Sequence, residues 1–173
     1  MKTGFRLLAA LGLSALAATA WAHGGATGIV KERMDGMTAM ENVMKSLAPM
    51  MKGATSYDEA SVATGAKVLS LHSGEAITAR FPEGSGGMPS EATDAIWSDW
   101  DEFEALALRL ETLAAGLEQA VANEGGDMSG LTMVGDGASL TVEQLAEMPA
   151  EHVFVMIGRT CAACHKKFRE RAK

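Results

Sequence analysis

The chain has 173 residues, 47% of them hydrophobic and 21% charged, with a formal net charge of -7 at pH 7. This length suits one domain with a hydrophobic core, and the acidic balance argues against a protein that binds nucleic acid or anionic lipid. In an exported protein, the two cysteines would ordinarily suggest one disulfide.

The first 22 residues have the pattern of a secretory signal peptide. Two basic residues precede an apolar run over residues 7–18, and a small-x-small cleavage site follows at residues 20–22. The apolar run is shorter than the roughly 20 residues of a membrane span. We therefore expect residues 23–173 to form one domain in the periplasm, with no membrane anchor after cleavage. Cleavage leaves 13 basic residues against 22 acidic residues, a formal charge of -9.

The first long helix is predicted over residues 27–51, with Pro49 in its last turn and Gly53 after its end. Steps of three and four residues define one seam, typical of a helix in a left-handed bundle: Val30, Arg33, Met37, Met40, Met44, Leu47 and Met51. Arg33 is the charged member of this seam, and an unpaired buried guanidinium would cost several kcal/mol. We expect it either to meet an anion, such as a haem propionate, or to extend to water near the helix end.

His23 would become the N-terminus after cleavage, and its amine and ring, with a Met-rich helix behind it, would also suit copper. The regular spacing of the methionines is better explained by packing.

The second helix is predicted from a capping-box signature at Ser56 and Glu59 to about Arg80. Its apolar face is weak, and His72 lies beside that face, so we interpret His72 as a boundary residue rather than a ligand. A break rich in Gly and Pro follows at residues 81–87.

The third helix is predicted from a cap at Ser90 to Val121, with an apolar seam along one side and acidic residues on the other. Trp97 flanks this seam, where it would cover the edge of a cofactor. Residues 123–139 are Gly-rich and are predicted to form a long loop.

The candidate functional residues lie near the C-terminus of the chain. A short helix over residues 141–148 leads to a long helix from residue 150 to about residue 171, which contains Cys161, Cys164 and His165. At about 100° per residue, these three side chains fall within one arc of about 100°. Two thiols and an imidazole at this spacing indicate one covalently attached haem c, with His165 on the iron. Gly158, one turn earlier, would let a flat ring approach the helix.

The same cysteine spacing also occurs in redox dithiols, disulfides and zinc sites. A zinc site would need a second cysteine pair, and the chain has none; a dithiol usually accompanies a βαβ pattern, which is also missing. A thiol oxidoreductase without haem is kept as an alternative. Four long helices and no strand pattern predict an all-α protein, an antiparallel four-helix bundle with haem near the C-terminal helix.

The chain resembles class II cytochromes c, the cytochrome c-prime superfamily, over nearly the whole predicted mature chain. The resemblance rests on the C-terminal haem motif with its continuation to Arg169, the Phe81-Pro82 break, Ile96-Trp97 with Phe103 downstream, and the segment from Val30 to Arg33. The loop over residues 123–139 looks longer than usual for this family.

The resemblance implies a haem held by Cys161 and Cys164, with His165 as the proximal ligand. The distal residue in this family comes one turn after the position of Arg33, which is Met37 here. Met37 is favoured over Met34 because heptad-like steps from Met37 lead to core positions, whereas steps from Met34 lead to charged residues. Arg33, Gly158, Trp97 and Phe168 are predicted to line the haem pocket, with Arg33 binding a propionate.

Members of this family with a distal methionine are six-coordinate and carry electrons, whereas those with an apolar distal residue are five-coordinate and bind gases such as nitric oxide. We predict an electron carrier with His165 and Met37 on the iron, with the gas-binding protein as the alternative. No pair of nucleophile and base is visible, so we do not expect an enzyme. Redox partner proteins are expected, and the resemblance also allows a homodimer through the first two helices.

Overall fold

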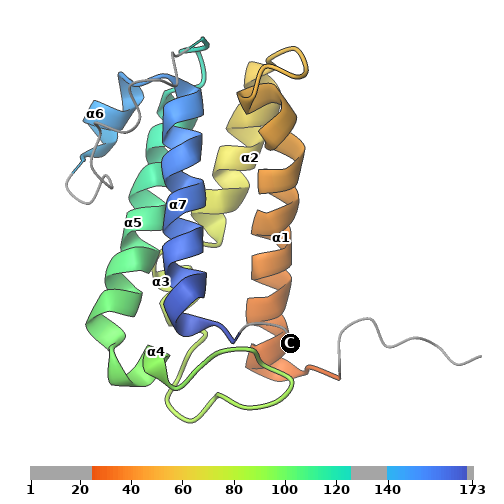
Figure 1. Cartoon of the computed structure of the whole chain (residues 1–173), viewed down its shortest axis with the longest axis vertical. Coiled ribbons are helices and arrows are strands. Elements are labelled where there is room, and N and C mark those ends of the chain that lie inside the picture. Colours follow the sequence, from red (N-terminus) through yellow and green to blue (C-terminus); the bar gives the residue numbers. More distant parts are fainter. Residues whose placement is uncertain (1–24, 126–139, 171–173) are drawn as a thin grey trace, which may run out of the picture.

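Four long helices pack side by side in alternating directions (Figure 1). The computed structural model describes residues 25–125 and 140–170. The long helices are α1 (Gly28–Met51), α2 (Glu59–Leu71), α5 (Trp100–Gln119) and α7 (Ala150–Phe168), and the short ones are α3 (Glu75–Thr78), α4 (Ala95–Ser98) and α6 (Val142–Ala146). Within these described ranges there is no β-strand, only an isolated bridge between Ala92 and Arg169. The predicted antiparallel four-helix bundle is confirmed.

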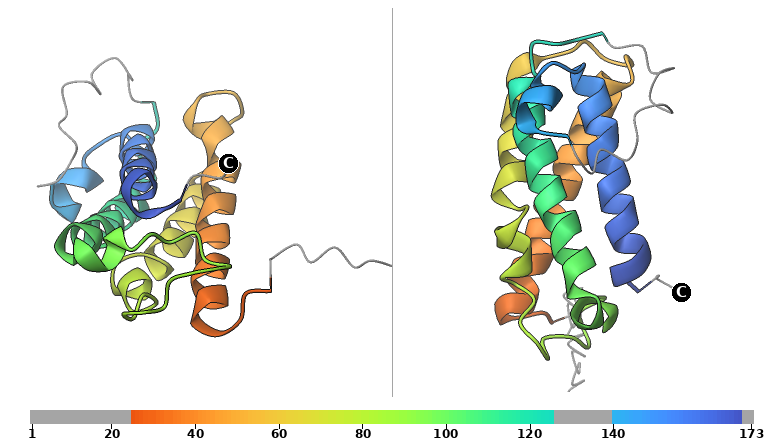
Figure 2. Two further views of the ribbon diagram at one scale, coloured as in Figure 1. Left: turned by 60° about the horizontal axis from the view of Figure 1, so that its bottom comes forward. Right: turned by 90° about the vertical axis from the view of Figure 1, so that its left-hand side faces the viewer.

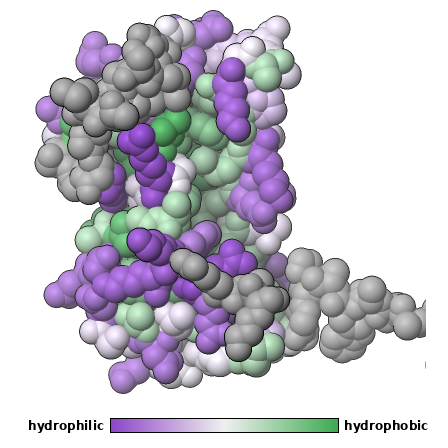
Figure 3. Space-filling view, viewed as in Figure 1, coloured by the Kyte–Doolittle hydropathy of each residue, from purple (hydrophilic) through white to green (hydrophobic). Residues whose placement is uncertain are grey.

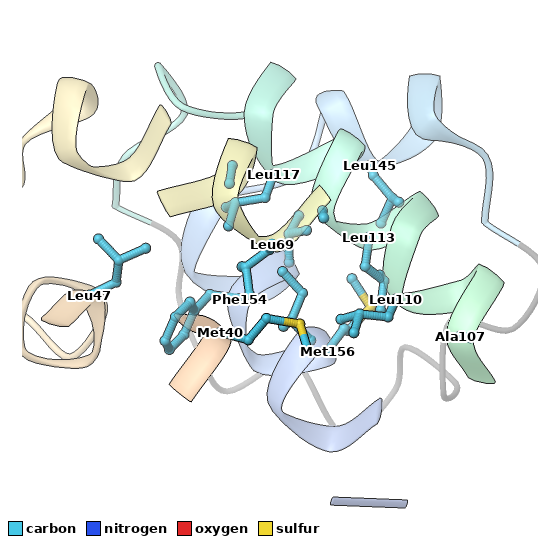
Figure 4. Close-up of a cluster of buried hydrophobic side chains, with 14 of the residues drawn as sticks. Met40, Leu47, Leu69, Ala107, Leu110, Leu113, Leu117, Leu145, Phe154 and Met156 are labelled. Atoms are coloured by element: carbon cyan, nitrogen blue, oxygen red, sulfur yellow. The ribbon is translucent and has the colours of Figure 1, made fainter. Parts of the chain in front are cut away.

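The helices pack in chain order, α1 on α2, α2 on α5 and α5 on α7, whereas α1 and α7 contact each other sparingly. Side chains from all four meet in one hydrophobic core, including Met40, Leu69, Leu113 and Met156 (Figure 4). The bundle is therefore closed on three sides and loosely joined on the fourth. Figure 2 shows the same order of helices from two further directions.

Helix α1 follows the sequence prediction closely. It ends at Met51, and Gly53 takes a φ of +68°, a conformation that favours glycine, while its N–H donates to the carbonyl of Met50 at 2.9 Å. Along the predicted seam, Arg33, Met40, Leu47 and Met51 are buried. The same seam leaves Met37 and Met44 half-buried.

The second helix differs from the prediction at both ends. Asp58, not Ser56, caps α2, because its carboxylate accepts from the Ser61 N–H. The helix ends at Leu71 rather than near Arg80, and α3 forms a separate turn. The break occurs at Gly74, where φ is +57° and the N–H donates to the carbonyl of Ala107 on α5, so contact with α5 interrupts the helix.

The third helix is also divided. Ser90 does not cap a helix; its buried hydroxyl accepts from the Ala92 N–H. The helical turn α4 and the long helix α5 meet at Asp99, whose φ of -136° and ψ of 50° are not helical. The single long helix predicted from Ser90 was therefore wrong at its start, because residues 90–94 are held by the end of α7 instead.

The last helices agree with the prediction in position. Thr141 and Gln144 form a capping box at the start of α6, and α7 begins after Pro149 and ends at Phe168, three residues earlier than expected. The predicted signal peptide over residues 1–22, residue His23 and most of the predicted loop over residues 123–139 lie outside the described residues. No helix in the described part of the chain is long and apolar enough to cross a membrane.

Glycine permits close contact between α5 and α6. A Cβ atom added at Gly116 would lie 2.4 Å from the Cβ of Leu145, a distance that real Cβ atoms do not show. The Leu145 side chain is fully buried, and its Cβ cannot move without its backbone. The position of α6 therefore depends on this glycine.

Replacing Gly116 with Ala should destabilise the apoprotein by about 1–3 kcal/mol, since overpacking outweighs the roughly 1 kcal/mol gain in helix propensity. Urea denaturation measures this change. The matched control is Gly158→Ala on α7, where an added Cβ would meet only Met44 Cε at 3.8 Å. That control should be neutral or stabilising, and equal effects of the two changes would contradict the packing argument.

Candidate haem site between helices α1 and α7

The predicted haem-attachment motif lies on one unbroken helix. Cys161, Cys164 and His165 all belong to the second half of α7, as the sequence predicted. Both cysteines are free and half-buried, and His165 is exposed. Because α1 begins at the end of the bundle where α7 ends, the first half of α1 and this motif lie at the same end (Figure 1).

Burial raises the pKa of the Cys161 thiol and raises the pKa of Cys164 to about 11, with a further contribution from the charge of Cys161. Thiol oxidoreductases use cysteines with a lowered pKa, because the thiolate is the nucleophile. Both thiols are therefore shifted in the direction opposite to that of a catalytic dithiol. Apolar surroundings of this kind suit cysteines that become thioethers.

The imidazole of His165 is suited to bind a metal. Although the residue is exposed, protein atoms packed beside the ring desolvate the imidazole and lower its pKa, the positive charge of Arg169 lowers it further, and the carboxylate of Glu91 opposes this shift. A lowered pKa keeps the imidazole neutral at neutral pH, which is the form that donates a nitrogen lone pair to iron.

On α1, Met37 rather than Met34 faces the core. Met37 packs against the buried hydrophobic cluster and lines a small pocket with Met40 and Phe81, while Met34 takes no part in that cluster. The preference for Met37 as the inward-facing methionine agrees with the heptad argument. Its bond to iron stays a prediction.

Arg33 is buried, with only 5% of its surface exposed, so the expectation that it extends to water was wrong. Its guanidinium donates to the carbonyl of Arg80 at 3.3 Å, to Ser85 Oγ at 3.1 Å and to the Ser85 carbonyl at 2.5 Å. It also lies over the ring of Phe81, 4.6 Å from the centroid. Burial lowers its pKa, and no carboxylate in the described ranges pairs with it.

Packing within the described part of the chain does not require glycine at position 158. The nearest atom to an added Cβ is Met44 Cε at 3.8 Å, an ordinary contact, so alanine would fit and would suit the helix better. Apolar side chains reach the surface between α1 and α7 in Figure 3, and Met37, Met44 and Cys161 are half-buried residues of these two helices. A flat apolar group between α1 and α7 would account for both the glycine and the incomplete burial.

Trp97 and Phe168 have structural roles at the same end of the bundle. The Trp97 Nε1–H donates to the carbonyl of Phe81 at 2.9 Å. Phe168 is buried and packs edge-on against Phe103, with ring centroids 5.4 Å apart. Neither role requires a cofactor, and their contact with haem stays a prediction.

The sequence reasoning missed the residues that hold the segment from Arg80 to Asp94. This segment crosses the end of the bundle (Figure 1). Its Ser85 accepts from Arg33, and its Thr93 N–H donates to the carbonyl of Phe168 at 3.0 Å, so it links α1 to α7. The partners are 52 and 75 positions apart, and no local pattern indicates them.

These residues fit haem c. The helix α7 presents two cysteines and a neutral imidazole, the facing side of α1 presents thioether and apolar groups, and a buried guanidinium without a carboxylate partner lies at the same end. A four-helix bundle with this motif on its last helix defines a class II type of c cytochrome.

Comparison with known proteins gives the family. A family model described as Cytochrome C' matches residues 28–136, and the chain belongs to that family. It is 28% identical to cytochrome c' of Rhodospirillum rubrum over 166 residues, 95% of this chain and 97% of that one. It is 30% identical to cytochrome c' of Pararhodospirillum photometricum over 142 residues, and 28% identical to cytochrome c-556 of Agrobacterium tumefaciens over 142 residues. These matches cover 82% of this chain and 95% and 97% of the relatives.

Solved structures show the same fold. A nitric oxide complex of a mutant cytochrome c prime from Alcaligenes xylosoxidans superimposes with a TM-score of 0.61 at 24% identity, covering 83% of this chain and 94% of that one. Cytochrome c' of Rubrivivax gelatinosus gives 0.60 at 22% identity, covering 82% and 94%. The protein is therefore a haem c cytochrome with covalently attached haem.

The raised thiol pKa values predict slow alkylation of the apoprotein. With a pKa of about 11, the thiolate fraction of Cys164 at pH 8 is about a hundredfold below that of a thiol at 9.0, and the greater nucleophilicity of its thiolate offsets this only in part. We expect alkylation by iodoacetamide at least tenfold slower in the folded apoprotein than in urea, with the rate rising toward pH 11. Equal rates in both states would contradict burial of the thiols and revive the oxidoreductase interpretation.

Gly158→Ala should impair haem insertion without harming the apoprotein. The methyl group would occupy space that we assign to the porphyrin, so we expect a several-fold lower yield of holoprotein or a shifted Soret band. Expression in a host competent in haem attachment, followed by an optical spectrum, measures both. Unchanged yield and spectrum would show that the ring does not approach this turn of α7.

Proposed function

We propose that this cytochrome binds a small gas such as nitric oxide, at a haem iron held on the protein side by His165 alone. The observation that carries the proposal is its membership of the cytochrome c' family, several of whose solved members are described as nitric oxide or carbon monoxide complexes. The haem, when bound, supplies an iron with one position open to the gas. This proposal takes up the alternative from the sequence, because the family evidence favours it over electron carriage.

In this proposal the chain's own residues position the haem and control access to it. Cys161 and Cys164 would hold the porphyrin to α7 through thioether bonds, and the neutral imidazole of His165 would bind the iron. Arg33 binds a haem propionate, which would neutralise its buried charge.

Met37 lies on α1, and whether its thioether binds the iron decides between gas binding and electron transfer. Met37 packs against the buried hydrophobic cluster, so the α1 side of the site is apolar around this side chain. In the gas-binding protein the Met37 thioether is a neighbour of the gas and not a ligand of the iron.

The second candidate function is electron transfer with Met37 as the sixth ligand. One observation favours it: the residue at the distal position of this seam carries a thioether and faces the core. Relatives named cytochrome c-556 are also among the similar proteins. Such a carrier would depend on redox partner proteins, and the acidic chain would suit a partner with a basic surface.

The remaining sequence predictions complete this proposal. We infer that residues 1–22 direct export to the periplasm, where haem is attached, and that the protein binds or carries rather than catalyses. A homodimer through α1 and α2 rests on the family resemblance, since the small apolar face of α2 with Val62, Ala66 and Leu69 is buried in the core of the chain itself.

The optical spectrum of the ferrous holoprotein tests the two functions. We expect a high-spin spectrum that changes when carbon monoxide is added, because an iron held only by His165 has a free position. A sharp low-spin spectrum that carbon monoxide leaves unchanged would overturn the gas-binding proposal in favour of electron transfer.

The Met37→Leu variant tests whether the Met37 thioether binds the iron. If the proposal holds, the variant stays high-spin and its carbon monoxide affinity changes by less than about tenfold, since a Met to Leu swap nearly conserves volume. Conversion from low-spin to high-spin would instead identify Met37 as the sixth ligand. Met34→Leu, on the same helix but outside the core cluster, is the matched control and should leave the spectrum unchanged.

A further inference from the structure

A small pocket between α1 and the region from α2 to Phe81 brings His72 and Arg80 together with Arg33. Its volume is about 10 Å³, close to the least that holds one water-sized atom. Three of its lining residues carry nitrogen donors, namely Arg33, His72 and Arg80, and the others are apolar or glycine. No aspartate or glutamate lines it.

Two of these residues have buried nitrogen atoms with no hydrogen-bond partner, His72 Nδ1 and Arg80 Nε. Arg80 Nη1 donates to the backbone carbonyl of Ala76, and Arg33 donates to the backbone carbonyls of Arg80 and Ser85. These bonds satisfy some of the donors but pair neither guanidinium charge with an anion. An unsatisfied buried polar atom costs about 1–3 kcal/mol. Arg80 Nε can only donate, and His72 Nδ1 donates in the tautomer that carries its proton there, so an acceptor in the pocket would satisfy both.

The backbone of α1 is shaped to admit the imidazole. A Cβ atom added at Gly36 would lie 3.2 Å from His72 Nδ1, closer than most Cβ contacts. Glycine at this position lets the ring of His72 lie against α1, one residue before Met37. His72, which the sequence suggests is a boundary residue, therefore packs against α1 and lines the same pocket as Arg33 and Met37.

We propose that this pocket binds a carboxylate of the haem, and that Arg80 and His72 contribute to binding it together with Arg33. Two guanidinium groups with no acidic partner among residues 25–125 and 140–170 favour an anion over a neutral molecule. The pocket admits carboxylate oxygen atoms but not a separate organic anion. The haem propionates are the anionic oxygens that the cofactor brings to the side of α1 where Met37 lies, and a water molecule is the competing occupant.

This inference rests on the bound haem of the proposed function but not on the gas. It assigns Arg80 and His72 to positioning of the cofactor through its carboxylate. Loss of either residue should weaken the hydrogen bonds to that carboxylate and leave the covalent attachment intact.

The test uses the holoprotein with Arg80→Gln and His72→Phe, the conservative variant Arg80→Lys, and Lys45→Gln as a charge-matched control. Lys45 is exposed on α1 and paired with Glu41, so its loss removes one positive charge outside the pocket. The primary readout is the propionate bending band in the resonance Raman spectrum, which reports hydrogen bonding to the carboxylates. The second readout is the midpoint potential.

We expect the bending band to move to lower frequency in Arg80→Gln and His72→Phe, to recover at least in part in Arg80→Lys, and to stay in place in Lys45→Gln. The potential should fall more in Arg80→Gln than in Lys45→Gln, because a buried positive charge stabilises the reduced haem more than a screened surface charge does.

A band that stays in place in both pocket variants would overturn the proposal and assign the pocket to water. If Arg80→Gln fails to fold, the band in His72→Phe decides alone. Failure of this inference is distinguishable from failure of the proposed function, since the haem bands and the response to carbon monoxide are recorded on the same samples.

Discussion

The buried guanidinium of Arg33 ties together the end of the bundle at which the haem site lies. It extends from α1 to two carbonyl groups and a hydroxyl of the segment after α3, and it lies over the ring of Phe81. That segment is in turn bonded to the last turn of α7 through Thr93. The segment thus links two helices that otherwise contact each other sparingly. Among the described residues, Arg33 lacks the carboxylate partner that a buried charge normally requires.

The glycines show which helix contacts belong to the polypeptide and which belong to the cofactor. At Gly116 and Gly65, an added methyl group would clash with side chains of a neighbouring helix, so these residues serve helix packing. At Gly158, the same methyl group would meet almost nothing. A helix gains stability from alanine in place of glycine, so the absence of a packing reason at Gly158 is an argument for a ligand there. A ligand between α1 and α7 would also account for the loose contact between these two helices.

The function depends on which side chains can reach the iron opposite His165. The packing of Met37 on the hydrophobic cluster, the depressed pKa of His165 and the raised pKa values of the two thiols all suit haem and do not suit thiol chemistry. Gas binding and electron transfer differ by a single bond between Met37 and iron. The family favours the first, and a thioether at the distal position is what makes the second a serious competitor.

Much of the fold and the core of the site could be read from local patterns. The seam of α1, the motif on α7 and the glycine before it all depend on residues within two turns of one helix, where helical periodicity alone places side chains on one face. The break at Gly74 could not be predicted, because its N–H donates to the distant carbonyl of Ala107 instead of continuing the helix. At Asp99 the helical hydrogen bonds persist on both sides, and the break is a local change of backbone conformation beside a contact with Lys167. The burial of Arg33 and the orphaned nitrogens of His72 and Arg80 arise from the packing of α1 on the chain between α2 and α4, so they become visible only when those segments are brought together in three dimensions.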